Sequence, residues 1–226
     1  MTAKLVLFDF DGTIADTYQA IADITNQLSS EFGYKPVEPE ELLLLKNLSS
    51  REIIKKTEIS LFKIPFLVKR VRNELSKEIA KLKPITGIER VLFQLKARGY
   101  SLGIVTSNDK HNVELFLAKN NLNFLFDFIY SSTSIFGKHR VIKRIIKHNQ
   151  WQREQIVYVG DETRDIRSAR KSRIGVVAVS WGFNSAEILA EFQPDFLVDR
   201  PQELAATIAA CYPANQKQFP VKVTAN

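Results

Sequence analysis

Short apolar runs that end in polar residues recur along the chain and predict buried β-strands. The runs span Lys4–Phe8, Ser101–Val105, Phe126–Tyr130, Gln155–Val159, Gly175–Val179 and Asp195–Val198. Segments with helical spacing of apolar residues lie between the later runs, at Ile85–Arg98, Asp109–Asn120, Lys138–Asn149, Thr163–Ser172, Ser185–Phe192 and Pro201–Cys211. This alternation indicates βαβ units with right-handed crossovers. It predicts an α/β protein with a doubly wound, Rossmann-like parallel sheet, covered by helices on both faces.

The segment from Asp16 to about Lys83 has no convincing strand pattern. It predicts helices near Asp16–Phe32, Glu38–Lys46, Ser49–Lys56 and Pro65–Leu82. A strand-free gap of this length is unusual between neighbours in a sheet, so we expect an inserted α-helical cap domain at 16–83. The core domain would then comprise 1–15 and 84–212. Extra helices packed on one face of the sheet are the alternative, and the polar stretch 213–226 is expected to be a flexible tail.

Composition narrows the class of protein. Lys and Arg total 32 against 25 Asp and Glu, and this excess is spread along helical faces, which favours a small anionic partner over nucleic acid. Cys211 is the only cysteine, which excludes a disulfide framework and a thiolate metal cluster. No apolar run reaches the length of a membrane span, and the first residues lack the arrangement of a signal peptide. We therefore expect no membrane association and a cytoplasmic location.

Chemically active side chains follow the predicted strands, at the edge where open α/β sheets bind ligands. They are Asp9, Asp11, Thr13, Thr106, Ser107, Asn108, Asp161 and Asp165, with Lys138 opening the helix after Phe126–Tyr130. Clustered carboxylates repel one another unless a cation lies between them, and Mg²⁺ typically binds one or two carboxylates together with water and phosphate oxygens. With hydroxyl groups and a lysine nearby, these are the parts required for phosphoryl transfer, in which a carboxylate can act as the nucleophile.

Other metal sites fit the pattern less well. In an EF-hand reading that starts at Asp9, Gly12 stands at the fourth position instead of the sixth, and Ala20 replaces the final glutamate. The three histidines show no pairing at zinc-ligand spacing. Magnesium therefore remains the predicted cofactor.

Four segments resemble the motifs of the haloacid dehalogenase superfamily, in order and at sensible separations: DFDGT at 9–13, IVTSN at 104–108, Lys138, and GDETRD at 160–165. The resemblance runs from about Lys4 to Ala210. SWGFN at 180–184, together with Pro194–Val198 and Pro201–Leu204, resembles the phosphoglycolate phosphatase-like branch, as does a helical cap after the first motif. The resemblance implies a magnesium-dependent phosphatase that hydrolyses a small phosphorylated metabolite through an aspartyl-phosphate.

The resemblance also implies a role for each matching residue. Asp9 would be the nucleophile and a magnesium ligand, and Asp11 the acid and then the base, with its backbone carbonyl on the metal. Thr106 and the backbone at Ser107 would hold phosphoryl oxygens, and Lys138 would neutralise Asp9 and the phosphoryl group. Asp161 would bind magnesium directly, whereas Asp165 would do so through water or orient Lys138. Because an alkoxide needs a proton to leave and a halide does not, Asp11 favours phosphate esters over halides.

Some positions depart from the superfamily pattern. No proline follows Lys138 closely, so Lys143 is an alternative for the active-site lysine. Glu162 stands where small residues are common and adds negative charge beside the metal. In the predicted cap, Lys46 and Arg51 are candidates for binding a substrate carboxylate or second phosphate, although an exposed basic face is the simpler interpretation. The basic residues from Arg164 to Arg173 are likewise interpreted as a solvated helix face.

Two other functions remain open at this point. A phosphosugar mutase would use the same aspartyl-phosphate but return the phosphoryl group to a sugar. A non-catalytic binding protein would keep the fold without turnover, and the basic surface together with the surroundings of Lys138 and Glu162 motivates it. The substrate and the oligomeric state are not readable from the motifs.

Overall fold

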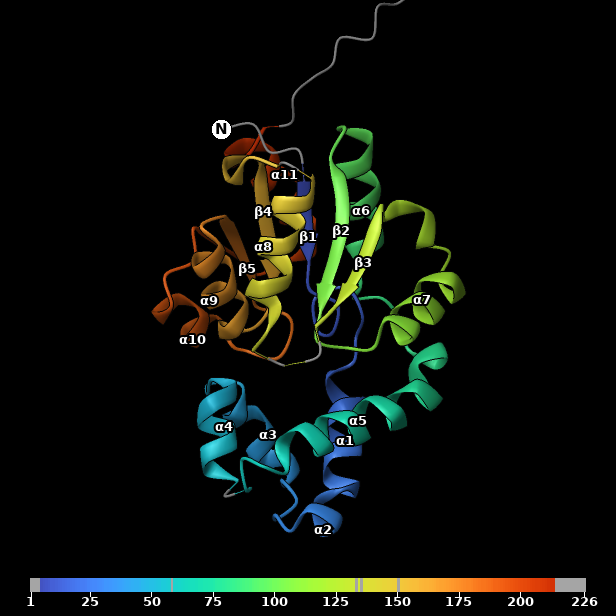
Figure 1. Ribbon diagram of the computed structural model, residues 1–226, viewed down its shortest axis with the longest axis vertical. Helices are drawn as coiled ribbons and strands as arrows, with labels where there is room; N and C mark the ends of the chain where they lie inside the picture. Colours follow the sequence, from blue (N-terminus) through green and yellow to red (C-terminus); the bar gives the residue numbers. More distant parts are fainter. Residues whose placement is uncertain (1–4, 58, 133, 135, 150, 214–226) are drawn as a thin grey trace, which may run out of the picture.

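A six-stranded parallel sheet forms the centre of the molecule in the computed structural model, which describes residues 5–57, 59–132, 134, 136–149 and 151–213 (Figure 1). Its strands are β1 Leu5–Phe8, β2 Ser101–Thr106, β3 Phe128–Ser131, β4 Ile156–Gly160, β5 Gly175–Val179 and β6 Phe196–Val198, in the order β3-β2-β1-β4-β5-β6. β1 pairs with both β2 and β4, so the strand order reverses direction beside it. The predicted doubly wound α/β fold is confirmed.

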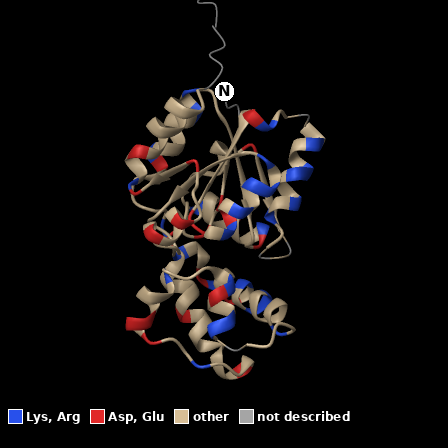
Figure 2. Ribbon diagram, turned by 90° about the vertical axis from the view of Figure 1, so that its left-hand side faces the viewer, with Lys and Arg blue, Asp and Glu red and all other residues tan. Residues whose placement is uncertain are grey.

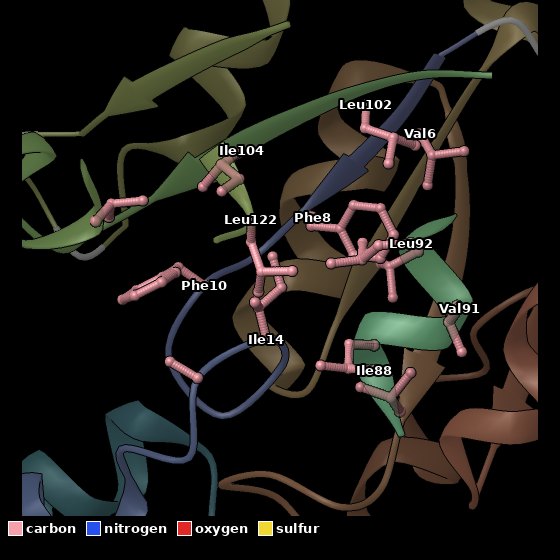
Figure 3. Close-up of a cluster of buried hydrophobic side chains, with 14 of the residues drawn as sticks. Val6, Phe8, Phe10, Ile14, Ile88, Val91, Leu92, Leu102, Ile104 and Leu122 are labelled. Atoms are coloured by element: carbon pink, nitrogen blue, oxygen red, sulfur yellow. The ribbon is translucent and has the colours of Figure 1, made fainter. Parts of the chain in front are cut away.

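Alternating side chains of β1 separate the two hydrophobic layers. Val6 and Phe8 face α6 (Ile88–Ala97), α7 (Lys110–Lys119) and α11 (Pro201–Cys211), in the layer shown in part in Figure 3. Leu5 and Leu7 face the other layer, which is covered by α8 (Lys138–Asn149), α9 (Thr163–Ser172) and α10 (Ala186–Glu191). All four side chains have no exposed surface, which accounts for the continuous apolar run of this central strand.

Several predicted boundaries were wrong by a few residues, each for a local reason. The helix expected from Ile85 begins at Ile88, because the Ile85 amide donates to the carbonyl of Ile14 at 2.8 Å and Gly87 takes a positive φ of 90°. β3 begins two residues later than expected, after the 3₁₀ turns η2 (Asn123–Leu125). A further 3₁₀ turn, η3 (Arg153–Gln155), precedes β4.

A helical insertion follows β1 and lies beyond the carboxyl ends of the strands, below the sheet in Figure 1. It contains α1 (Tyr18–Gln27), α2 (Ser29–Phe32), α3 (Pro39–Leu45), α4 (Ser50–Lys56), α5 (Ile64–Glu78) and the 3₁₀ turn η1 (Ile79–Lys81). Capping boxes start α3 at Glu38 and α4 at Ser49. The first predicted helix is broken at Leu28 into α1 and α2. The insertion does not lie on a face of the sheet, unlike the arrangement considered as the alternative.

Two chain segments connect the insertion to the sheet and pair with each other. The Asp16 amide donates to the Lys83 carbonyl at 3.0 Å, and Ala15 forms an antiparallel bridge with Pro84. These crossings coincide with the predicted limits at 15/16 and 83/84, although the division into two domains stays a prediction. Beyond Pro213, the predicted flexible tail lies outside the described residues.

Charged residues occur on both parts of the molecule, and several Lys and Arg residues share one helix beside the sheet (Figure 2). This helix is α8, with the sequence KHRVIKRIIKHN. Within the described part of the chain, no helix combines the length and the apolar character needed to cross a membrane.

Candidate active site

The first motif bends sharply at the end of β1. Asp9 still pairs with β4, since its amide donates to the Val159 carbonyl at 2.8 Å. Phe10 turns into the core, where its ring meets Phe116 edge-to-face with 5.1 Å between the ring centres. Gly12 has a φ of 72°, and a Cβ at this position would lie 2.4 Å from Asp161 Oδ2. Glycine is therefore needed here both for the backbone conformation and for the close approach of Asp161.

Three carboxylates meet where β1 and β4 end. Asp9, Asp161 and Asp165 each bring one oxygen to a site in which these atoms lie within 4.8 Å of one another, and all three residues are buried. Adjacent parallel strands bring Asp9 and Asp161 together, and the first turn of α9 adds Asp165. The structure thus assembles residues that are 156 positions apart at most in the sequence (9 to 165).

Lys138 lies among these carboxylates. Its Nζ atom is 2.5 Å from Asp9 Oδ2 and donates to Asp165 Oδ1 at 2.7 Å, and the side chain is 1% exposed. Lys143, the alternative for the active-site lysine, is exposed on the same helix. Of the two lysines, the structure brings Lys138 to the site.

The charges of Lys138 and the three carboxylates interact with one another. Burial disfavours the charged Lys138, but the carboxylates of Asp165 and Asp9 outweigh it and raise its pKa above the ordinary value. Burial, followed by the charge of Asp9, raises the pKa of Asp161 well above its usual range. One ammonium group therefore does not fully balance three buried carboxylates.

The remaining imbalance fits a hard divalent cation. Asp9 Oδ2 is buried, and among the described residues it has no donor besides the Lys138 ammonium group at 2.5 Å. Carboxylate oxygens at this separation match the donor set that Mg²⁺ prefers. Asp9, Asp161 and Asp165 are the residues that would hold the ion.

Asp161 is held in place by two donors. Thr13 Oγ1 donates to its Oδ1 at 2.6 Å, and the Phe183 amide donates to its Oδ2 at 2.7 Å. Thr13 belongs to the first motif and Phe183 to the loop after β5, so two segments far apart in the sequence fix one carboxylate.

Asp11 has a different environment from Asp9. It lines a cavity beside the site, and its Oδ1 accepts a hydrogen bond from Asn108 Nδ2 at 2.9 Å. Asn112 Nδ2 in turn donates to Asn108 Oδ1 at 3.0 Å, which fixes the amide orientation. Burial, followed by the charge of Asp9, raises the pKa of Asp11 to about 7. Asn108 was expected at this edge together with Thr106 and Ser107, but no role was predicted for it.

Thr106 and Ser107 lie at the end of β2, next to β1. Thr106 is fully buried and its Oγ1 accepts from the Asn108 amide at 2.9 Å, which leaves the hydroxyl hydrogen for a donor bond. Ser107 lines the cavity, and its Oγ accepts from Arg164 at 3.2 Å. Both predicted phosphate-binding residues therefore lie at the edge that carries the carboxylates.

Arg164 was interpreted as part of a solvated helix face, and this was wrong. Its side chain is 14% exposed and pairs with Glu162, whose side chain is 10% exposed. Although burial alone would raise it, the Arg164 guanidinium holds the pKa of Glu162 below its ordinary value. Ser50 of the insertion donates to Glu162 Oε2 at 2.9 Å. The position of Arg164 in the first turn of α9, inside the GDETRD motif, was the available sequence signal.

Lys46 and Arg51 take positions away from the cavity. Lys46 Nζ donates to the Gly182 carbonyl at 2.9 Å and lies 4.4 Å from the centre of the Tyr18 ring. Arg51 is exposed and lies over Phe136. Neither belongs to the described residues that line the cavity, and their predicted contact with substrate stays untested.

The cavity has a volume of about 280 Å³ and separates the sheet edge from the insertion. Asp11, Ser107 and Asn108 form its sheet end, and Arg72 of α5 and Arg164 lie in its wall. Apolar side chains of α1, α4 and α5 form most of the rest. Asp9 is 1% exposed and is not among the described lining residues.

Comparison with known proteins places this arrangement in a family. The family model of haloacid dehalogenase-like hydrolases matches residues 6–179. A phosphoglycolate phosphatase of Synechococcus elongatus is 34% identical over 205 residues, which cover 91% of this chain and 97% of the relative. The pyrophosphatase PpaX of Bacillus thuringiensis (strain Al Hakam) is 26% identical, with 90% of this chain and 95% of the relative covered.

A solved structure agrees with this result. The crystal structure of a predicted phosphatase from Clostridium acetobutylicum superimposes with a TM-score of 0.80 at 25% identity, covering 93% of this chain and 100% of that chain. The chain therefore belongs to the haloacid dehalogenase-like hydrolase family and is an enzyme of its phosphatase branch.

Proposed function

We propose that this protein is a magnesium-dependent phosphatase that hydrolyses a small phosphorylated metabolite through an aspartyl-phosphate on Asp9. The observation that carries the proposal is the buried set of Asp9, Asp161 and Asp165 around Lys138, placed beside a cavity that contains Asp11. This arrangement combines a nucleophile, a place for a cation and an acid in separate environments.

In the first step, the Asp9 carboxylate attacks phosphorus and the bond from phosphorus to the alcohol oxygen breaks. Lys138 sits 2.5 Å from Asp9 Oδ2, where it can balance charge on the nucleophile and on the phosphoryl oxygens. Asp11, on the cavity side, donates a proton to the leaving alkoxide. The Thr106 hydroxyl and the backbone at Ser107 hold phosphoryl oxygens.

In the second step, Asp11 takes a proton from water, which attacks phosphorus and releases inorganic phosphate and the Asp9 carboxylate. Asn108 positions Asp11 for both transfers through its 2.9 Å hydrogen bond. When bound by the three carboxylates and the Asp11 carbonyl, Mg²⁺ would neutralise charge on the transferred group. Since Asp9 is 1% exposed, entry of the phosphoryl group requires side chains or the insertion to move.

We infer that residues 16–83 act as a cap that selects the alcohol part of the substrate. The support is that the insertion supplies much of the cavity wall while the sheet edge supplies the acids. Phosphoglycolate, the substrate named for the Synechococcus relative, is the natural reference compound.

The test is release of phosphate from a panel of phosphorylated metabolites. Turnover should require Mg²⁺, stop when the metal is chelated and vanish in Asp9→Asn. Asp16→Asn, the same change at an exposed position in the connecting segment, should keep activity. Unchanged turnover in Asp9→Asn would overturn the proposal. Conversion of a hexose 1-phosphate into its isomer, without free phosphate, would favour a mutase instead.

A further inference from the structure

The wall of the cavity opposite the sheet is mostly apolar. Its apolar lining comes from three helices and the loop before α5, and consists of Ile21, Ile53, Ile54, Ile59, Ile64, Leu67, Val68, Val71 and Leu75. In α5 the lining positions 64, 67, 68, 71 and 75 follow the spacing of a single helix face. The apolar face of this helix is thus turned toward the cavity that contains Asp11.

These side chains are incompletely packed against one another. Ile53, Ile54, Leu67, Val68 and Val71 are half-buried, although they lie inside the boundary between the insertion and the sheet. An apolar side chain gains more from contact with another apolar group than from contact with water in a cavity. The half-buried side chains of this wall therefore favour binding of an apolar ligand group.

Three hydroxyl side chains of the same wall donate to backbone carbonyls of the insertion. Thr25 Oγ1 donates to the Ile21 carbonyl at 2.6 Å, and Tyr34 donates to the Thr25 carbonyl at 2.5 Å. Thr57 Oγ1 donates to the Ile54 carbonyl at 3.1 Å. These hydroxyl hydrogens are therefore committed and do not offer donors to a ligand.

Two cations line the cavity close to its sheet end, and both have partners in the protein. Arg72 donates to the Ser132 carbonyl at 3.3 Å, and Arg164 is paired with the buried Glu162. An anionic group deep between α4 and α5 would meet apolar side chains, and burying it there without hydrogen bonds is unfavourable. A carboxylate or second phosphate on the alcohol is thus poorly matched to this wall.

We propose that the preferred substrate is the phosphate monoester of an uncharged, hydrocarbon-rich alcohol, whose apolar body occupies the cavity between the sheet edge and α4–α5. This inference rests on the proposed phosphatase function and specifies its substrate class. The phosphate lies at the Asp11 end, and the alkyl or aryl part extends along the α5 face.

The test compares n-alkyl phosphates from methyl to hexyl with phosphoglycolate, using kcat/KM for phosphate release. In parallel, calorimetry measures binding of the matching n-alkylphosphonates, which are not hydrolysed. Each added methylene should improve kcat/KM and affinity roughly two- to fourfold until the cavity is filled. Phosphoglycolate should be at least about tenfold poorer than butyl phosphate.

A matched pair of variants locates the effect. Leu67→Gln, in the cavity wall, should flatten the dependence on chain length, whereas Phe66→Gln, at a neighbour that is 67% exposed, should preserve it. If Leu67→Gln fails to fold, the milder Val68→Thr tests the same wall, with a smaller flattening expected.

The outcomes separate the two proposals. Hydrolysis without dependence on chain length, or a preference for phosphoglycolate, overturns the substrate class and leaves the phosphatase in place. Phosphonate affinity that rises with chain length, without hydrolysis of any ester, overturns the phosphatase and supports the apolar site.

Discussion

The sheet edge and the helical insertion differ in how completely their side chains are buried and paired. At the sheet edge, Asp9, Lys138, Asp161 and Asp165 are all at most 1% exposed, and each contacts a charged or hydrogen-bonding partner. The insertion has a sparse interior, with Ile24, Leu28, Phe32, Ile59, Leu75 and Ile79 as its buried apolar residues within the described chain. Several large apolar side chains there are exposed, with Phe62 reaching 89%.

The difference in packing indicates that the sheet edge and the insertion have different functions. Phosphoryl transfer needs charges held to a fraction of an ångström, which packed strands and a buried ion network provide. Recognition of an alcohol part tolerates looser packing, and elements with few buried contacts lie at the low end of local stability. Variants in the two parts should therefore differ in what they damage.

The largest effect is expected from Lys138→Ala. It leaves Asp9 and Asp165 buried without their ammonium partner, so the free energy of unfolding should fall by about 3–5 kcal/mol and activity should be lost. Denaturant unfolding and phosphate release measure the two quantities. Lys143→Ala, at an exposed position of the same helix, should change stability by less than about 0.5 kcal/mol. Equal losses in both variants would contradict the position of Lys138 in the site.

Asp11→Asn should damage chemistry more than stability. Without the proton donor, single-turnover release of the alcohol from an alkyl phosphate should slow about 100- to 10,000-fold, while release from an aryl phosphate with an acidic leaving group should slow much less. The ratio of the two losses, measured with one enzyme preparation, reports the acid role. Asp109→Asn, which replaces an exposed helix cap by another good cap, is the control. A loss that is the same for both esters would argue against proton donation by Asp11.

The sheet part was predictable because its signals are local. A buried parallel strand appears in the sequence as an apolar run, and the residue after it must lie at the carboxyl edge of the sheet. Asp9, Thr106 and Asp161 could therefore be placed at one edge from the sequence alone. The helix limits near Ile85 and Asp16 could not, because hydrogen bonds between the two connecting segments replace the helical ones.

The contacts that the sequence did not reveal involve side chains whose partner lies far away in the sequence. In the sequence, Arg164 resembles the other basic residues of α9. In the structure it donates to Ser107 after β2, and its partner Glu162 accepts a hydrogen bond from Ser50 of the insertion. Lys46 likewise contacts Gly182, which is 136 residues away. Such pairings depend on how the insertion meets the sheet, which no spacing in the sequence encodes.

Arg164→Met tests the junction between the two parts. It leaves the Glu162 carboxylate buried without its guanidinium, so the free energy of unfolding should fall by about 2 kcal/mol. The double variant Glu162→Gln/Arg164→Met should recover part of this loss, as a double-mutant cycle would measure. Lys171→Met, exposed on the same helix, should be nearly neutral. Additive losses in the cycle would mean that the two side chains do not act as a pair.

The smallest effect is expected from Lys46→Met, which tests whether a residue that joins the insertion to the sheet also binds substrate. The ammonium group joins the insertion to the sheet through Gly182 and the Tyr18 ring, so its loss should cost about 1 kcal/mol of stability. Because Lys46 is not among the residues lining the cavity, KM for phosphate esters should change less than about threefold. A large rise in KM with unchanged stability would instead make Lys46 a substrate ligand. It would also mean that the surface which selects substrate extends beyond the cavity, to the junction at Gly182.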